Sequence, residues 1–287
     1  MMKNDILRAL SIFLLVIAFS SQGQDSTLNI QSLAPYGENE DAASLSLSLN
    51  TSYMKNNLFS IYAQNVGVGY NTQLFQDDYN LFFHSEIGVS TLRLDGKDSE
   101  NSLSVGGFGN VDIEFGKSSR GWHLIGVDFG YALGIPQSQH SQFDEHNILL
   151  NIDYGYAFLG KYFSWIPYAR VETYIFIPRA YRKNIPFDGG MNAILGLKGI
   201  QTFKMWEWGF NIGAFSDLNL SGSSIGILAD NTIIYDREGI SNGAFGEFNM
   251  ALITSHHFQM LAKINCSYML SYYEINLKGT LLLSYQF

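Results

Sequence analysis

The chain has few of the features that stabilise small secreted scaffolds or helical membrane proteins. Its only cysteine is Cys266, so no disulfide framework can form within it. Only 5 of its 287 residues are proline, and only 15% are charged. Beyond the first twenty residues, no apolar run reaches the roughly 18 to 20 residues that a transmembrane helix needs. These absences exclude a disulfide scaffold and a bundle of membrane-spanning helices.

Basic residues are also scarce. The 17 lysines and arginines face 26 aspartates and glutamates, which gives a formal net charge of −9. Proteins that bind nucleic acid neutralise phosphates with an excess of basic side chains, whereas this chain has an excess of acidic ones. Nucleic acid is therefore not an expected partner.

The first residues have the composition of a secretory signal. Lys3 and Arg8 are basic, residues 9–19 are apolar, and Ser21 and Gly23 are small residues at the spacing of a cleavage site. The apolar run is too short for an uncleaved anchor, which is the alternative. Residues 1–23 are predicted to be a signal peptide and 24–43 a short periplasmic lead-in. Because Cys266 is far from this run, no N-terminal lipid anchor is expected.

In the rest of the chain, hydrophobic residues alternate with polar ones instead of forming long runs. Hydrophobic residues make up 46% and aromatics 15%, yet the mean hydropathy is only +0.01. Between 148 and 158, apolar Ile148, Leu150 and Ile152 alternate with Asn151 and Asp153. A period of two indicates a strand that is apolar on one face only.

The same pattern predicts twelve strands. They are expected near 44–53, 61–74, 80–94, 102–115, 122–135, 147–158, 164–177, 190–200, 205–215, 243–254, 257–270 and 273–287. Most reach the roughly 9–11 residues that a tilted strand needs to cross a bilayer. The predicted fold is all-β: a single transmembrane antiparallel up-and-down β-barrel of about twelve strands, over residues 44–287. A soluble β-sandwich is the alternative.

Connections and tryptophans agree with this topology. With a periplasmic N-terminus, the predicted external loops are longer than the periplasmic turns, as in bacterial barrels. The longest predicted loop is 216–242. Four tryptophans stand where predicted strands leave the periplasm, and such residues favour the membrane interface. These candidates for an inner aromatic girdle are Trp122, Trp165, Trp206 and Trp208.

The end of the chain resembles the bacterial outer-membrane β-barrel proteins. Phe287 is a terminal aromatic, preceded by Tyr285, Leu283 and Leu281 in alternation with polar residues, although Leu282 stands where the common pattern has glycine. In that superfamily this strand is the signal read by the barrel-assembly machinery. The resemblance implies an outer-membrane location with both termini periplasmic, surrounded by lipid and lipopolysaccharide. It implies the assembly machinery and periplasmic chaperones as partners, and it points to no particular family.

The inward face is where function is expected. Twelve strands lie between small filled barrels and wide porins, so the lumen can be open or closed. The alternation places the charged side chains of the strands inside, where they avoid lipid. The predicted lumen-lining residues are Glu86, Asp112, Glu114, Asp128, Asp153, Arg170, Glu172, Lys198, Glu207, Glu247, Lys263 and Lys278.

Two functions remain open on this evidence. The acidic surplus predicts a small pore or transporter for ions or small polar solutes, with a field that favours cations. Pairing of acids and bases across the lumen, with Arg170 and Glu172 among them, would instead give a closed structural or surface-binding barrel that uses 216–242 for recognition. An autotransporter translocator is less favoured, because about twenty residues before the first strand are too few for a passenger.

An enzyme is not expected. Outer-membrane phospholipases place a histidine and a serine two residues apart, and no His-x-Ser occurs here. His84 and Ser85 are adjacent, so they face opposite sides of a strand, and His84 with Glu86 is an isolated inward pair. His256 and His257 lack a third ligand nearby, so no metal site is predicted, and no cofactor is expected.

Overall fold

The computed structural model describes most of the chain beyond its first forty-one residues. The described residues are 42–57, 60–76, 79–94, 100–136, 146–160, 163–177, 188–203, 206–219, 239–253, 258–271 and 273–286. The predicted signal peptide, almost all of the predicted lead-in, and Phe287 lie outside them.

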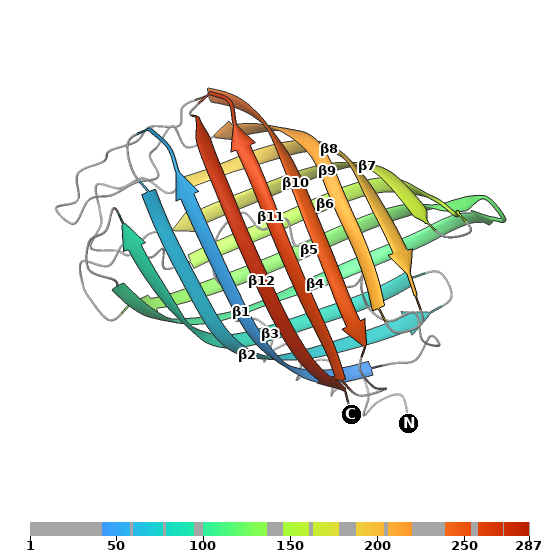
Figure 1. The fold of residues 1–287 in the computed structure, drawn as a ribbon, viewed down its shortest axis with the longest axis horizontal. Helices are drawn as coiled ribbons and strands as arrows, with labels where there is room; N and C mark the ends of the chain where they lie inside the picture. Colours follow the sequence, from blue (N-terminus) through green and yellow to red (C-terminus); the bar gives the residue numbers. More distant parts are fainter. Residues whose placement is uncertain are drawn as a thin grey trace.

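The described chain forms twelve strands in one closed barrel (Figure 1). They are β1 (Ala42–Lys55), β2 (Ser60–Gln76), β3 (Tyr79–Leu94), β4 (Glu100–Ser118), β5 (Gly121–Pro136), β6 (His146–Phe158), β7 (Ser164–Ile177), β8 (Asp188–Thr202), β9 (Trp206–Asn219), β10 (Gly239–Ile253), β11 (Phe258–Met269) and β12 (Glu274–Gln286). Each strand pairs with its neighbours in sequence, so the topology is up-and-down. The predicted fold class is confirmed.

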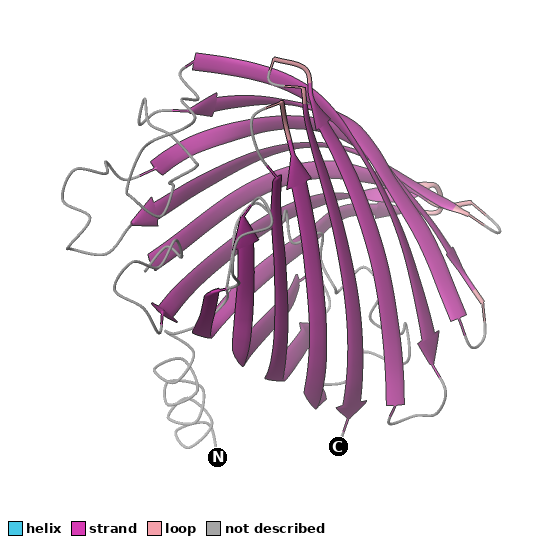
Figure 2. Cartoon of the chain, turned by 60° about the vertical axis from the view of Figure 1, so that its left-hand side comes forward, coloured by secondary structure: helices cyan, strands magenta, loops and turns pink. Residues whose placement is uncertain are grey.

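The barrel closes between its first and last strands. β1 and β12 are antiparallel in a register that runs from Ser44 opposite Gln286 to Lys55 opposite Ile275. Figure 2 shows the strands strongly inclined as they wind around the barrel. Closure leaves no unpaired sheet edge, which satisfies the backbone of every strand. Among the described residues, no helix is long and apolar enough to cross a membrane.

The two ends of the barrel differ in the length of their connections. One end, called here the short-turn end, has the connections 77–78, 119–120, 159–163, 203–205 and 254–257. The other, the long-loop end, has 56–59, 95–99, 137–145, 178–187, 220–238 and 270–273. The predicted asymmetry is confirmed, because no connection at the short-turn end exceeds five residues.

The predicted boundaries of the longest loop are wrong. β9 continues to Asn219 and β10 begins at Gly239, and these two residues are register partners. The alternation of Ser216 to Leu218 continues the strand, but the polar composition of this segment resembles a loop. The connection is therefore 220–238, and it lies outside the described residues.

The outer face of the wall is apolar. Leu45, Val68, Ile87, Phe129 and Leu195 expose between 51% and 70% of their surface, whereas their strand neighbours on the other face are largely polar or small. A soluble protein would bury such residues, and a transmembrane barrel turns them toward lipid.

The tryptophans divide between the two faces. Trp165 and Trp206 are exposed on the outer face, and Trp208 shares that face. Phe163 joins them, with ring centroids 4.5 Å from Trp165 and 5.6 Å from Trp208. Trp122 instead lies on the inward face of β5, the face that also carries Leu124 and Gly126. It therefore cannot belong to a lipid-facing girdle. Its position near the strand start suggested an interface, but the parity of β5 decides its direction.

Candidate functional site in the barrel lumen

A row of polar side chains, six of them amides or carboxylates and the last a serine hydroxyl, crosses the inward wall. Its members are register partners on seven successive strands: Asn110, Asp128, Asn151, Glu172, Asn192, Asp217 and Ser241. All seven are buried, with exposures of 1% to 8%. We call this set the amide–carboxylate row.

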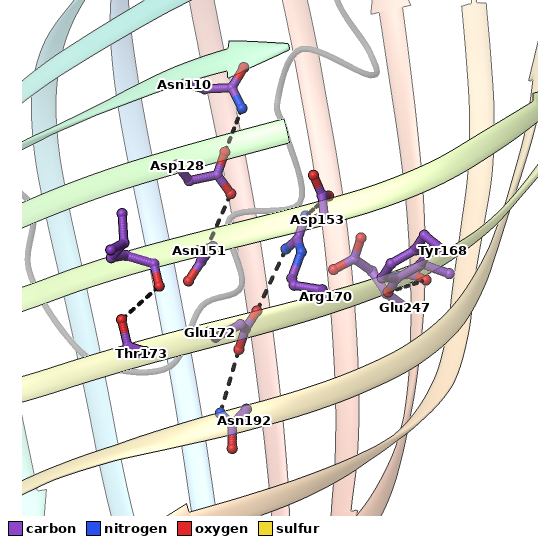
Figure 3. Close-up of polar contacts among 12 residues, drawn as sticks. Asn110, Asp128, Asn151, Asp153, Tyr168, Arg170, Glu172, Thr173, Asn192 and Glu247 are labelled. Atoms are coloured by element: carbon purple, nitrogen blue, oxygen red, sulfur yellow. Dashed lines mark hydrogen bonds and ion pairs between the residues drawn. The ribbon is translucent and has the colours of Figure 1, made fainter. Parts of the chain in front are cut away.

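Hydrogen bonds connect the members of the row (Figure 3). Asn110 Nδ2 donates to Asp128 Oδ1 at 2.5 Å, and Asn151 Nδ2 donates to Asp128 Oδ2 at 3.3 Å. Asn192 Nδ2 donates to Glu172 Oε2 at 3.5 Å. Because each amide offers its donors to an adjacent carboxylate, the row holds buried negative charge without a basic partner at every position.

Arg170 is the main basic residue beside this row. Its Nη2 lies 2.7 Å from Asp153 Oδ2, its Nη1 lies 3.6 Å from Glu172 Oε1, and its side chain is only 1% exposed. The guanidinium therefore compensates the buried carboxylate of Glu172 on β7 and the partly buried carboxylate of Asp153 on β6. The sequence predicted all three residues to line the lumen, and the structure brings them together.

Glycines let side chains reach beyond the adjacent strand. Asp112 on β4 and Asp153 on β6 both lie over Gly126 of β5, where an added Cβ would be 3.0 Å from Asp112 Oδ1 and in collision with Asp153 Oδ1. Two carboxylates consequently converge over one backbone position. Both are only partly buried, so their field reaches the lumen.

Tyr168 makes a similar contact from β7 to β9. Its ring covers Gly196 of β8, and its hydroxyl donates to Asn211 Oδ1 at 3.0 Å. The ammonium of Lys198 lies 4.8 Å from the centroid of that ring, and Arg170 Cζ lies 5.8 Å from it. The aromatic face thus positions two basic groups next to the acidic centre.

The other predicted lumen residues form smaller groups. Glu86 accepts from Ser48 Oγ at 2.5 Å and lies 3.6 Å from His84 Nε2. Lys263 lies 2.9 Å from Glu247 Oε2. Glu207 accepts from Thr202 Oγ1 at 2.6 Å near the short-turn end.

Glu114 and Lys278 complete the predicted set. Glu114 is 3.3 Å from Lys117 in an ion pair at the short-turn rim, where both side chains are at least 36% exposed. Lys278 is half-buried on the inward face of β12, between its register partners Asn265 and Ser52.

Sequence reasoning missed further inward acids and most of the amides. Asp217 was placed in a loop, but it is 2% exposed and accepts from Tyr174 at 3.1 Å. Glu274 is fully buried at the start of β12. With the eight predicted acids, ten acidic side chains face inward among those described, against the four bases Arg170, Lys198, Lys263 and Lys278. The predicted strand 273–287 already placed Glu274 on the same face as Lys278, so the alternation could have identified it.

One part of the inward face is more accessible than the rest. On β11, β12 and β1, eight adjacent polar residues are only half-buried: Lys263, Asn265, Ser267, Asn276, Lys278, Thr280, Asn50 and Ser52. We call them the hydrophilic strip. The amide–carboxylate row on β4 to β10 is buried by comparison. The strip therefore presents a continuous half-buried polar surface to the lumen.

The comparisons with known proteins show the fold. No protein-family model and no curated protein matches the chain. The translocator domain of the autotransporter NalP from Neisseria meningitidis matches with a TM-score of 0.54 at 12% identity, covering 90% of this chain and 91% of that domain. The β-domain of the Bordetella autotransporter BrkA matches with a TM-score of 0.55 at 9% identity, covering 86% of this chain and 99% of that domain.

At these identities the likeness concerns architecture alone. The chain has the fold of the bacterial outer-membrane β-barrels, as the pattern of its last strand predicted. Tyr285, the described part of the predicted assembly signal, is 54% exposed on the outer face of β12 between Leu45 and Phe258. Phe287, His256 and His257 lie outside the described residues.

Proposed function

We propose that this protein is a narrow outer-membrane pore that favours cations and passes small ions or small polar solutes. The proposal rests on the excess of inward acidic side chains among those described, nine besides Glu114 at the rim against four basic ones. An excess of one charge sign in a low-dielectric wall raises the local concentration of the opposite ion. In this proposal the short-turn end and both termini are periplasmic.

The arrangement of the charges supports this role. Arg170 is committed to Asp153 and Glu172, and Lys263 is committed to Glu247. Asp112 adds a second partly buried carboxylate, which converges with Asp153 over Gly126. A cation moving along the hydrophilic strip would therefore pass a negative centre on the facing wall.

Neutralising that centre tests the proposal. Asp112→Asn keeps the size of the side chain and removes its charge, so the preference for K⁺ over Cl⁻ in a planar bilayer should fall by a factor of about two or more. Glu114→Gln is the matched control, because its carboxylate is exposed at the rim and already paired with Lys117. An Asp112→Asn preference equal to that of the wild type, or a larger change in the control, contradicts the assigned role of the lumen charges.

A closed structural or surface-binding barrel is the second candidate. It is favoured by the burial of Arg170 and of the whole amide–carboxylate row, because these inward side chains are almost inaccessible to water. In that case the 220–238 connection would be the recognition element. A correctly folded barrel that stays electrically silent in a bilayer would favour this candidate over the pore.

Assembly and chemistry are separate parts of the proposal. We infer that the end of β12, with Tyr285 and Phe287, is read by the barrel-assembly machinery after delivery by periplasmic chaperones. Lipid and lipopolysaccharide would then surround the apolar outer wall. That the chain is not an enzyme stays a prediction from its sequence.

A further inference from the structure

Two basic side chains face outward near the long-loop end of the barrel. Lys55 of β1 and Arg93 of β3 are both exposed. They share strand faces with Leu45 and Val89, which point away from the lumen. Among the strand residues whose side chains the structure describes, Lys117 at the short-turn rim is the only other lysine, arginine, aspartate or glutamate on the outward side. The outer wall of this acidic chain therefore carries positive charge, and most of it lies in one place.

β2 joins the two basic residues across the wall, because it lies between β1 and β3 (Figure 1). Lys55 pairs with Ser60 of β2. Arg93 pairs with Tyr62, two residues further along β2, and Tyr62 pairs in turn with Tyr53. With strands about 4.8 Å apart and a rise of about 3.3 Å per residue, the Cα atoms of the two basic residues lie about 12 Å apart. We call Lys55, Arg93, Tyr53 and Tyr62 the basic rim patch.

The wall next to the patch changes from polar to apolar in two steps. One step of the alternation nearer the middle of the barrel, the outward register partners are neutral and polar: Thr51, Gln64, Thr91 and Asn101. Thr91 Oγ1 donates to Asn101 Oδ1 at 2.8 Å within this row. One step further, the outward register partners are apolar: Leu49, Val66, Val89 and Leu103.

This order of rows fits one amphipathic molecule that lies along the wall. Guanidinium and ammonium groups bind phosphate through charge-assisted hydrogen bonds. Tyrosine at a membrane interface keeps its ring in the apolar layer and its hydroxyl in the polar one. Hydroxyl and amide side chains can bond to sugar, ester or amide groups, and the apolar row packs against acyl chains. The matching ligand is a phosphorylated lipid whose head group points to the long-loop end.

We propose that the basic rim patch binds the phosphate groups of lipid A, the membrane anchor of lipopolysaccharide. A base on a lipid-facing wall is costly without a counter-charge, so a phosphate at this level stabilises Lys55 and Arg93. A diphosphorylated sugar lipid supplies a phosphate for each base and hydroxyl groups for the neutral row. This inference rests on the orientation in the proposed function, because the long-loop end must be external for lipopolysaccharide to lie beside the patch.

Lipid binding in detergent tests the patch without any conductance. The refolded barrel is mixed with diphosphorylated lipid A, and native mass spectrometry counts the bound lipid. The double variant Lys55→Gln, Arg93→Gln removes both charges, so its apparent Kd for lipid A should rise about tenfold or more. The matched control Lys117→Gln, Arg120→Gln removes two exposed bases at the short-turn end and should bind like the wild type. An unchanged Kd in the first variant, or an equal rise in both, would overturn the patch.

A charge-preserving variant separates the contribution of charge from that of folding. The double variant Lys55→Arg, Arg93→Lys keeps two bases at the patch and should recover most of the lost affinity. A loss as large as that of the glutamine variant would overturn the proposed phosphate contacts. Each variant is confirmed as a folded barrel by its electrophoretic mobility with and without boiling.

A second lipid tests the choice of ligand. Phosphatidylglycerol has the same phosphate chemistry but one phosphate and no sugar, so it should bind about fivefold or more weakly than lipid A. Equal or tighter binding of phosphatidylglycerol would assign the patch to a phospholipid head group and overturn lipid A as its occupant.

Labelling of intact cells separates the patch from the orientation on which it rests. In a Cys266→Ser background, Asn57→Cys, exposed at the long-loop end, should react with a membrane-impermeant maleimide. Reaction only after the cells are broken would overturn the orientation and, with it, lipid A as the ligand. Reaction in intact cells, together with unchanged lipid A binding by the Lys55→Gln, Arg93→Gln variant, would overturn the patch alone and leave the proposed function standing.

Discussion

At the scale of single residues, the lumen depends on how each buried charge is compensated. Arg170 lies between two carboxylates from neighbouring strands, and its side chain is almost inaccessible to water. The cost of burying these groups is offset only while the ion pairs are intact. Removal of the guanidinium would leave Asp153 and Glu172 as adjacent negative charges without their ion-pair partner.

Arg170→Met should therefore destabilise the barrel strongly. We expect a loss of about 3–5 kcal/mol in the free energy of unfolding, the usual effect of removing one partner from a buried ion pair. Urea unfolding in lipid vesicles measures it. Lys117→Met is the control: it breaks the exposed pair with Glu114 and should cost less than about 1 kcal/mol. Similar losses in the two variants would mean that Arg170 is not a structural centre.

At the scale of strands, glycine decides which residues can meet. Tyr168 on β7 reaches Asn211 on β9 only because Gly196 on the intervening strand has no side chain. Asn65 on β2 likewise donates to Ser104 on β4 at 2.8 Å, across Gly88 of β3. These contacts tie together strands that share no backbone hydrogen bonds.

Gly196→Ala tests this coupling. An added Cβ would lie 2.6 Å from the Tyr168 ring, so the ring must move, and unfolding should require about 1–3 kcal/mol less free energy. Gly246→Ala is the matched control on β10, because nothing lies within 4 Å of the added atom. It should be neutral or slightly stabilising, since alanine restricts the unfolded chain. Urea unfolding that ranks the two variants the other way would refute the contact over Gly196.

Most strands were predictable because the side chains along each strand alternate between the polar lumen and the apolar outer face. The alternation of Ile148, Leu150 and Ile152 with Asn151 and Asp153 fixed both the strand and its inward face. The same rule placed Arg170 and Glu172 in the lumen. It failed at strand ends, such as Asp217, where a short polar segment reads equally well as a loop.

The contacts across strands were not predictable. Periodicity assigns a face, but which residues on different strands meet depends on the stagger of the whole barrel. The convergence of Asp112 and Asp153 over Gly126 is an example, since these residues are far apart in sequence.

At the scale of the whole molecule, closure of β1 onto β12 turns twelve separate strands into one unit. Their register extends over nearly the full length of both strands, from Ser44 opposite Gln286 to Lys55 opposite Ile275. With the wall closed, the polar residues share a lumen and the apolar residues face lipid. Neither half of the chain can satisfy its edge strands alone.

Closure can be tested by interrupting the seam. Leu283→Pro removes a backbone donor in the C-terminal part of β12, opposite Leu47, and proline disrupts strands that are paired on both sides. The variant should lose the mobility difference between boiled and unboiled samples in electrophoresis. Leu283→Val is the control and should retain it, because valine keeps the donor and suits a strand. A Leu283→Pro barrel with wild-type mobility would contradict the importance of the closed seam.

The central claim is that the lumen conducts cations. The most direct test is the reversal potential of the refolded wild-type protein in a planar bilayer with a KCl gradient. The acidic excess of the inward face predicts discrete current steps whose reversal potential is shifted from zero toward the equilibrium potential of K⁺. A reversal potential shifted toward the equilibrium potential of Cl⁻, or no current from a correctly folded barrel, would contradict the account.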